Sequence, residues 1–200
     1  MMIEIETARL HLRRFTPGDL DDLYPIFSDP KVLTYMKTGE PASRAETEYA
    51  LSSIIKHWEQ HGFGRWAVVY KETGKLIGYG GLRNLDGTPE LVYLLARAYW
   101  DRGLATEIAR ASLKWGFEER HFERIVALTR PNHAASRRVM EKVGMIYERD
   151  MRYLDVDVVL YTISHLTYQL RRVLHKVPLA CMPDNALSRR PAERLLSTDA

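Results

Sequence analysis

Seven segments of the chain carry the hydrophobic pattern of β-strands. Some alternate apolar and polar residues, as ARLHLRRF does, whereas others are short continuous apolar runs such as RIVALT. Alternation is typical of a strand with one buried face, and a short continuous run is typical of a strand in the centre of a sheet. We therefore predict strands at residues 8–15, 65–70, 76–82, 90–96, 124–129, 145–151 and 157–164.

Four further segments combine the apolar spacing of a helix with signals for where a helix begins. Thr16 and Pro17 begin the first, which has acidic residues in its first turn, and Ser43 begins the second, where Glu46 completes a capping box. The stretch between these two helices, PKVLTYMKTGEPAS, is read as a loop or a broken helix. We predict helices at residues 16–29, 43–61, 104–119 and 134–142.

The order of these elements defines a mixed α/β chain. A strand, two helices and three strands are followed by helix, strand, helix and two strands, so the second half holds a β-α-β-α-β segment. We predict one domain at residues 1–177. Residues 178–200 contain three prolines and little periodicity, so we expect a flexible C-terminal tail there.

Composition and charge exclude several classes of protein. The chain is 46% hydrophobic and 28% charged, which is ordinary for a globular protein with a buried core. Its formal net charge is only +3 and its basic residues are scattered, so we do not expect a nucleic-acid partner. The N-terminus lacks the apolar core of a signal peptide, and no apolar run is long enough to cross a membrane. We therefore expect a cytoplasmic protein without a membrane partner.

Neither the cysteine nor the histidines predict a metal site. Cys181 is the single cysteine, so it cannot form an internal disulfide or a cysteine metal cluster. His57 and His61 have the i, i+4 spacing of a metal-binding pair, but no third ligand is evident. We expect no metal cofactor.

The junction between the strand at 90–96 and the helix at 104–119 is a candidate anion site. A helix begins with four N–H groups that have no intrahelical partner, and the summed peptide dipoles make that end positive. Gly103 lets a ligand approach the backbone, Thr106 offers a hydroxyl group, and Arg102 adds a full charge. The junction therefore predicts a phosphate or pyrophosphate site. The plainer alternative is that Gly103 only makes the turn, because neither a Walker loop nor GxGxxG is present.

Several segments resemble the GNAT superfamily of acyl-CoA-dependent N-acetyltransferases, in particular its branch of ribosomal-protein N-terminal acetyltransferases (RimJ/RimL-like). The resemblance covers about residues 5–168 and keeps its order. It implies a central mixed, mostly antiparallel sheet of about seven strands flanked by about four helices, with acetyl-CoA as co-substrate. The segments that carry it are ELVYLLARAYWDRGLATEIARASLKWGFEE, RIVALTRPNHAASRRVMEKVGM, ETARLHLRRFTPGDLDDLYPIFSDPKVLTYM and GKLIGYGGL.

The resemblance also implies where the cofactor would lie. Its pantetheine arm would lie like an added strand along an exposed strand edge, where main-chain pairing gives affinity without side-chain specificity. Asn132 or His133 would meet this arm, and Ser136 would lie near the sulfur atom. The residues beside the pantetheine would be Leu95, Ala96 and Arg97, and those at the pyrophosphate would be Arg102, Gly103, Leu104, Ala105 and Thr106.

The expected reaction is direct attack of a primary amine on the thioester in a ternary complex. The amine must be neutral to attack, and Glu90, which matches the glutamate of the family's E-I-G-Y stretch, is the first choice of base. The alternative for Glu90 is a carboxylate that only attracts a cationic substrate. A main-chain N–H near Leu95 would stabilise the oxyanion. Met140 stands near the position of the tyrosine that many family members use as general acid, so Ser136 or a water would have to take that role.

The acceptor is expected to be a small-molecule or peptide amine. A protein N-terminus, an amino acid, a polyamine and an aminoglycoside-like drug all stay open, as do another acyl-CoA, a hydroxyl acceptor and a sensor that binds acyl-CoA without turnover. The oligomeric state stays open too, with a homodimer among the options. We expect the acceptor pocket to be lined by Tyr35, Met36, Trp58 and Tyr153.

Overall fold

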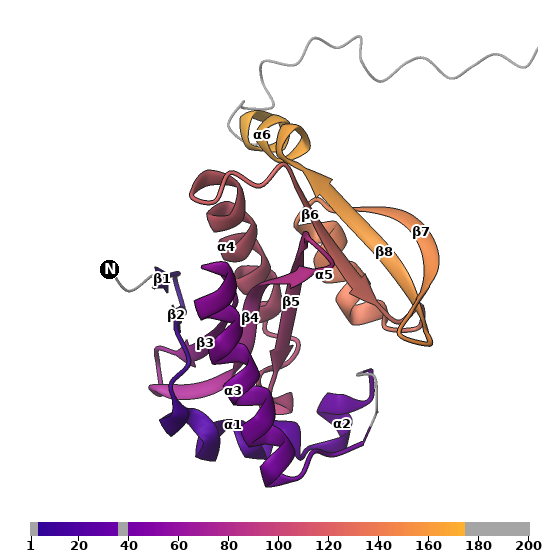
Figure 1. Ribbon diagram of the computed structural model, residues 1–200. Coiled ribbons are helices and arrows are strands. Elements are labelled where there is room, and N and C mark those ends of the chain that lie inside the picture. The colour runs from indigo at the N-terminus through magenta and orange to yellow at the C-terminus, as the bar shows by residue number, and fades with distance from the viewer. Residues whose placement is uncertain (1–3, 36–39, 175–200) are drawn as a thin grey trace, which may run out of the picture.

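A single eight-stranded sheet forms the centre of the protein in the computed structural model, which describes residues 4–35 and 40–174. Its strands follow the order β1-β2-β3-β4-β5-β6-β8-β7 (Figure 1). All neighbouring strands are antiparallel except β5 and β6, which are parallel. The strands are β1 (Ile5–Glu6), β2 (Leu10–Arg13), β3 (Arg65–Tyr70), β4 (Lys75–Leu85), β5 (Thr88–Leu95), β6 (Arg124–Thr129), β7 (Ile146–Tyr153) and β8 (Val156–Ser164).

The mostly antiparallel mixed sheet confirms the expected fold class. The seven predicted strands are all present, and β3 and β6 have the predicted bounds to the residue. The eighth strand, β1, was not predicted because two residues are too few to show a period of two. It pairs with β2 through Ile5 and Leu12 and through Glu6 and His11.

The described residues also form six α-helices and two short 3-10 helices. Four of the α-helices confirm the predicted ones, and the capping box of α3 is present, with Ser43 N donating to Glu46 Oε2 at 2.7 Å. The short α2 lies in the stretch read as a loop or broken helix, and α6 was not predicted. The helices are η1 (Pro17–Asp19), α1 (Leu20–Phe27), α2 (Pro30–Leu33), α3 (Arg44–His61), η2 (Arg97–Tyr99), α4 (Leu104–Glu118), α5 (Ala134–Lys142) and α6 (His165–Leu174).

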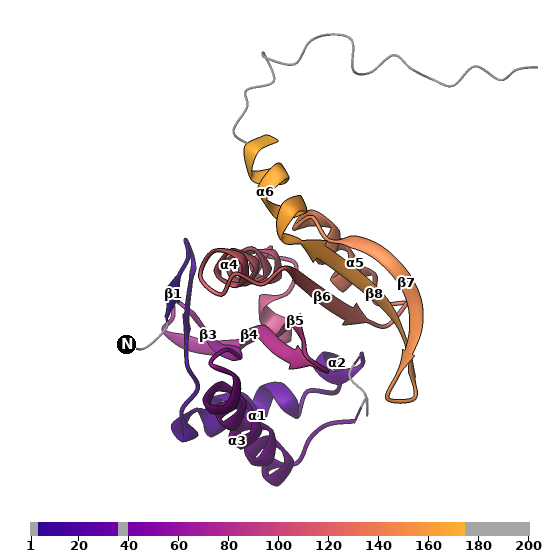
Figure 2. The ribbon, with the colours of Figure 1, turned by 45° about the horizontal axis from the view of Figure 1, so that its top comes forward.

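Helices cover both faces of the sheet. Figure 2 shows α1 and α3 on one side of β3–β5 and α4 on the other. The strands serve both layers because their side chains alternate. On β5, Leu91 and Leu95 pack in the cluster that contains Ile108 and Leu113 of α4, whereas Leu94 packs with Leu23 of α1. The sheet is thus the middle layer between two buried clusters.

The pairing of β5 with β6 is the feature that positions the site. The two strands share a single register pair, Glu90 with Val126, although β4 and β5 pair over eight positions. Beyond Glu90 the strands diverge, and the open end of β5 leads through η2 to the start of α4. The sheet is therefore continuous at one end of β5 and split at the other.

Candidate active site

The chain that follows the open end of β5 presents a helix N-terminus. Gly103 has φ +75°, in the left-handed region that favours glycine, and precedes Leu104, the first residue of α4. The first bond of the helix runs from Glu107 N to Gly103 O at 3.1 Å. The amides of residues 103–106 therefore have no intrahelical partner, as the sequence predicts for a helix that begins here.

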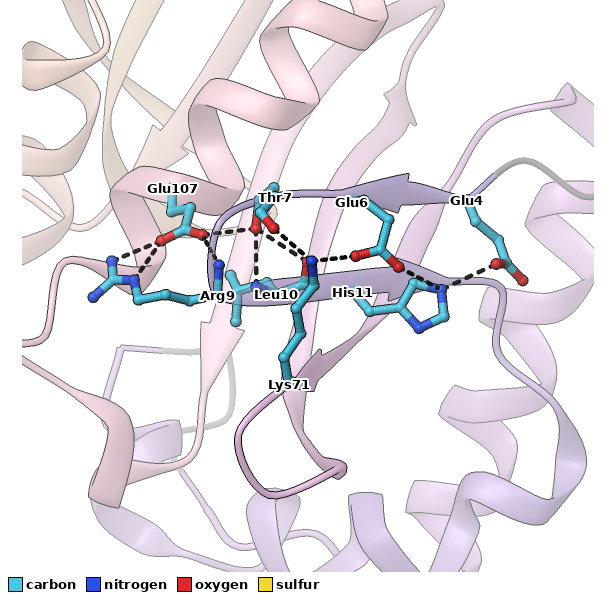
Figure 3. Close-up of polar contacts among 8 residues, drawn as sticks. All are labelled: Glu4, Glu6, Thr7, Arg9, Leu10, His11, Lys71 and Glu107. Carbon is cyan, nitrogen blue, oxygen red and sulfur yellow. Dashed lines mark hydrogen bonds and ion pairs between the residues drawn. The ribbon is translucent and has the colours of Figure 1, made fainter.

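A network of hydrogen bonds holds this N-terminus against the first β-hairpin. Glu107, in the first turn of α4, accepts bonds from Thr7 Oγ1 at 2.7 Å and from Arg9 N at 2.9 Å (Figure 3). Arg9 also forms an ion pair with Glu107, with Nε and Nη2 both 2.7 Å from Oε2. Its Nη1 donates to the carbonyl oxygen of Arg102 at 2.8 Å. Arg9 thus binds both sides of the Gly103 turn.

This network orients one of the free amides and keeps Glu107 charged. In a planar trans peptide the C=O and N–H point in opposite directions. Because the carbonyl of Arg102 points to Arg9, the N–H of Gly103 points away from it. Burial would raise the pKa of Glu107, but the hydrogen bonds from Thr7 and Arg9 outweigh it and lower the pKa.

A cavity of about 790 Å³ lies against the split between β5 and β6. This volume is in the range of small-molecule and cofactor sites. Its wall includes the hairpin residues Tyr153, Leu154 and Val156, as well as Tyr35 after α2. It brings together most of the residues predicted for the site, namely Glu90, Leu95, Gly103, Leu104, Ala105, Thr106, Asn132, His133 and Ser136.

Three of the predicted cofactor residues do not line this cavity: Ala96, Arg97 and Arg102. Ala96 donates its N–H to Ile77 O of β4 at 2.8 Å. Arg97 forms a long ion pair with Asp29, at 3.7 Å, and the guanidinium of Arg102 stacks 5.5 Å from the centre of the Tyr99 ring. The geometry therefore gives these three residues other partners.

The N–H of Leu95 faces the split. Successive residues of a strand direct their N–H groups to opposite sides. Because Ala96 N bonds to β4, the N–H of the preceding Leu95 points toward the β6 side, where β5 and β6 are not paired. It is the main-chain donor that the sequence predicts for an oxyanion.

Tyr93 is a site residue that the sequence did not reveal. Its hydroxyl group lies 2.9 Å from Ser136 Oγ and donates to the carbonyl oxygen of Ser136 at 3.1 Å. Ser136 is only 6% exposed, and both residues line the cavity. Burial raises the pKa of Tyr93 to about 12, although its hydrogen bond with Ser136 acts against the rise. The phenol therefore stays protonated and able to donate.

His133 and Asn132 differ in how they are held. The ring of His133 stacks on Tyr35 with centroids 3.8 Å apart, and its Nδ1 lies 3.1 Å from Thr129 Oγ1. Burial lowers the pKa of His133, so the ring is neutral at pH 7. Asn132 is exposed at the cavity.

Glu90 lies at the point where β5 and β6 separate. It is 2% exposed and forms an ion pair with Arg83 Nε, its register partner on β4. Burial would lower the pKa of Arg83, but the Glu90 carboxylate outweighs it and raises that pKa. Arg83 also lines the cavity, so Glu90, the predicted base, is already paired with a cation.

The expected acceptor pocket is partly corrected. Tyr35 and Tyr153 line the cavity, whereas Trp58 is 4% exposed and packs against Trp66 and Trp115 in the core. The prediction for Trp58 was wrong because an aromatic residue at helical spacing most often faces the core. Met36 lies outside the described residues, as do Cys181 and the predicted tail at 178–200.

Neither a metal cluster nor a membrane span is found in the described part of the chain. His57 donates or accepts at both nitrogens, with Nδ1 2.9 Å from Phe63 O and Nε2 accepting from Asn84 N at 2.9 Å. No group of three or more histidine, cysteine, aspartate or glutamate side chains among residues 4–35 and 40–174 is arranged to hold a metal. The helices described are too short or too polar to cross a bilayer.

In this chain a split parallel strand pair leads to a glycine-capped helix. The family model described as an acetyltransferase (GNAT) domain matches residues 9–146, more than half of the chain. The chain belongs to the GNAT family of acetyltransferases.

Relatives and solved structures agree with this assignment. The uncharacterized protein YkkB of Bacillus subtilis is 33% identical over 168 residues, which cover 79% of this chain and 94% of YkkB. The uncharacterized N-acetyltransferase p20 of Bacillus licheniformis is 28% identical over 84% of this chain and 99% of its own. A GNAT-family acetyltransferase from Bacillus anthracis superposes with a TM-score of 0.73 at 26% identity, covering 82% of this chain and 99% of that one.

The fold is also that of RimL, a ribosomal L7/L12 alpha-N-protein acetyltransferase solved in complex with coenzyme A. The TM-score is 0.71 at 16% identity, and the match covers 81% of this chain and 98% of RimL. The expectation of a GNAT acetyltransferase is therefore confirmed, and ribosomal-protein acetyltransferases are among its structural neighbours.

Proposed function

We propose that this protein transfers an acetyl group from acetyl-CoA to a primary amine by direct attack in a ternary complex. The observation that carries the proposal is the split between β5 and β6, which ends at the four free amides of residues 103–106. One elongated ligand with a pyrophosphate at one end and a thioester at the other fits this combination. Acetyl-CoA has both groups, and RimL, which shares the fold, is solved with coenzyme A, the thiol form of this molecule.

The cofactor would be held mainly by the backbone. The amides of Gly103, Leu104, Ala105 and Thr106 would bind the pyrophosphate, since a helix N-terminus stabilises an anion without a cationic side chain. The pantetheine arm would follow β5 at Leu95. Asn132 suits this arm better than His133, because Nδ1 of His133 is already occupied by Thr129. Arg102 would contribute its charge without lining the cavity.

The chemistry needs a neutral amine and a stabilised oxyanion. An alkylamine has a pKa of roughly 10, so its proton must leave before attack. Glu90 would attract the ammonium group and take its proton, directly or through a water molecule. The amine nitrogen then bonds to the thioester carbon, and the oxyanion accepts from Leu95 N–H. The C–S bond breaks, and the second proton of the nitrogen passes through solvent to the departing thiolate.

Tyr93 and Ser136 would stabilise the departing thiolate. A thiol has a pKa of about 8.5, well below the value of about 12 for Tyr93, so full proton transfer from the phenol would be uphill. Donation of a hydrogen bond is favourable once the phenol O–H turns from the Ser136 carbonyl oxygen to the sulfur, and Ser136 Oγ can then donate to the phenol oxygen. The two residues therefore supply the donor that Met140 cannot.

The test is thiol release from acetyl-CoA across a broad panel of amines. Acetylation of an amine, with a fall in kcat of about 10²- to 10⁴-fold in Glu90→Gln, is the expected result. The control is Glu118→Gln, which breaks a more exposed ion pair with Arg172 at the C-terminal end of α4 and should leave kcat unchanged. Binding of acetyl-CoA without turnover on any amine would contradict the proposal and favour a sensor. Two further comparisons in the same assay test the remaining alternatives. Other acyl-CoAs in competition with acetyl-CoA show which acyl group is transferred, and hydroxyl compounds in competition with amines show which acceptor atom is used.

A further inference from the structure

A second cation faces the same cavity as Arg83 and Glu90. Arg65 on β3 is in register with Gly81 on β4, two residues before Arg83, which is itself in register with Glu90. Positions two residues apart on a strand, and positions paired across strands, share a face of the sheet. All three charged side chains therefore project on the face covered by α1 and α3, and all three line the cavity.

The guanidinium of Arg65 makes no hydrogen bond and no direct ion pair among the described residues, although the charge of Glu90 acts on it through space. Its Nε is enclosed and makes no hydrogen bond. Its one defined contact is the face of the Tyr79 ring, whose centre is 5.3 Å from Cζ. The charge is held where water solvates it poorly, and this burial lowers the pKa of Arg65. Arginine stays protonated at neutral pH, so the cation persists.

The charge balance at this end of the cavity is therefore incomplete. Arg65 and Arg83 supply two positive charges, and Glu90 supplies one negative charge that is already bound to Arg83. An enclosed cation that shares a single carboxylate with a second cation is only partly neutralised, and a ligand carboxylate that reaches it relieves that cost. The planar fork of arginine matches a carboxylate with two parallel hydrogen bonds. A polyamine, by contrast, would add positive charge beside two cations.

We propose that Arg65 binds a carboxylate of the acceptor, so that the acceptor is an amine that also carries a carboxylate, such as an amino acid. This inference rests on the proposed acetyl transfer and narrows its substrate class. The acceptor carboxylate meets Arg65 and its amino group meets Glu90. The cavity thus binds both charged groups of a zwitterion, and Tyr79 holds the guanidinium of Arg65 in place.

The test compares each of a set of amino acids with its carboxamide, which keeps the amine and removes the negative charge. We expect kcat/KM to be about 10- to 100-fold higher for the acids, as for one charge-assisted hydrogen-bonded contact. Arg65→Met should abolish this preference while leaving the KM for acetyl-CoA unchanged. Arg65→Lys, which keeps the charge but not the fork, should retain part of it.

A matched control is Arg120→Met. Arg120 stacks on Trp115 at 5.8 Å, much as Arg65 stacks on Tyr79, but it lies outside the cavity, so the acid preference should persist. Equal rates on acids and carboxamides would overturn the inference and leave acetyl transfer standing. If no amine is acetylated, the proposed function fails. The role of Arg65 is then tested separately, by calorimetry that measures binding of N-acetyl amino acids in the presence of coenzyme A. Binding that is lost in Arg65→Met supports it, and absence of binding to the native protein overturns it.

Discussion

Arg9 gives the sharpest test of how the N-terminus of α4 is held. Its side chain binds Glu107 and the carbonyl of Arg102, and both contacts lie beside the four amides proposed to bind pyrophosphate. We expect Arg9→Met to weaken coenzyme A binding without affecting the acceptor, because methionine keeps much of the side-chain bulk and removes every donor. Arg9 is a positioning residue in this account, since it acts through the turn at Gly103.

The magnitude follows from the contacts and their exposure. A hydrogen bond to a charged group contributes about 1.5–3 kcal/mol, and an exposed ion pair about 1 kcal/mol or less. The side chain of Arg9 is 43% exposed and that of Glu107 is 15% exposed, so a value between these limits, about 1–2 kcal/mol, is appropriate. If all of it serves to order the turn, the Kd for coenzyme A rises about 5- to 30-fold.

Calorimetry with coenzyme A, together with steady-state kinetics, measures this effect. The KM for acetyl-CoA should rise by a similar factor while the KM for the amine stays the same. Arg44→Met is the control, because it removes an exposed ion pair with Asp21 at 2.5 Å that is far from the cavity. Coenzyme A affinity equal to that of the unmodified protein, combined with a lower Tm, would refute the reasoning and leave Arg9 a purely structural role.

Three further predictions concern the same site. Gly103→Ala should lower the free energy of unfolding by about 1–2 kcal/mol, because φ is +75° there, and should weaken coenzyme A binding. The control is Gly74→Ala, at φ +66° in a remote turn, which should lower Tm by a similar amount and leave the affinity for coenzyme A unchanged. Tyr93→Phe should lower kcat about 10-fold with little change in either KM, as steady-state kinetics would show; an unchanged kcat would remove the phenol from the mechanism. Because the pKa of Glu107 is lowered from 4.5 in the folded protein, its contribution to stability is present above pH 4.5 and is lost as the pH falls through the folded pKa. Glu107→Gln should therefore flatten the acid side of the Tm profile, and an unaltered profile would contradict this assignment.

Local sequence signals were enough to predict most of the fold and the glycine turn at the start of α4. The start of α4 follows from a glycine before an apolar periodic segment, and β3 and β6 follow from uninterrupted apolar runs with β-branched residues. These features depend on residues close together in the chain. By contrast β1 is too short to show a period, and α6 leaves most of its apolar residues exposed and docks on Phe117 of α4 mainly through Tyr168 and His165.

The missed parts of the site depend on contacts between distant segments. Tyr93 and Ser136 are 43 residues apart, and an alternating strand gives no indication that a tyrosine on it meets a helix. Arg65 and Arg83 carried a weak signal, because each is an arginine at the end of an apolar strand. The splitting of β5 from β6 also has no local signature, since it reflects how two strands pair and not what either contains.

The split has a consequence for how this sheet meets other chains. A strand whose backbone groups are unpaired recruits an additional strand, and proteins usually guard such borders. Here the outer borders are guarded: β1 is two residues long, and β7 carries alternating charges in IYERDMRY. The receptive border lies in the interior, between β5 and β6. The unpaired backbone of β5 and β6 thus offers an extended chain a place to pair inside the sheet, whereas the short β1 and the charged β7 disfavour pairing at its outer edges.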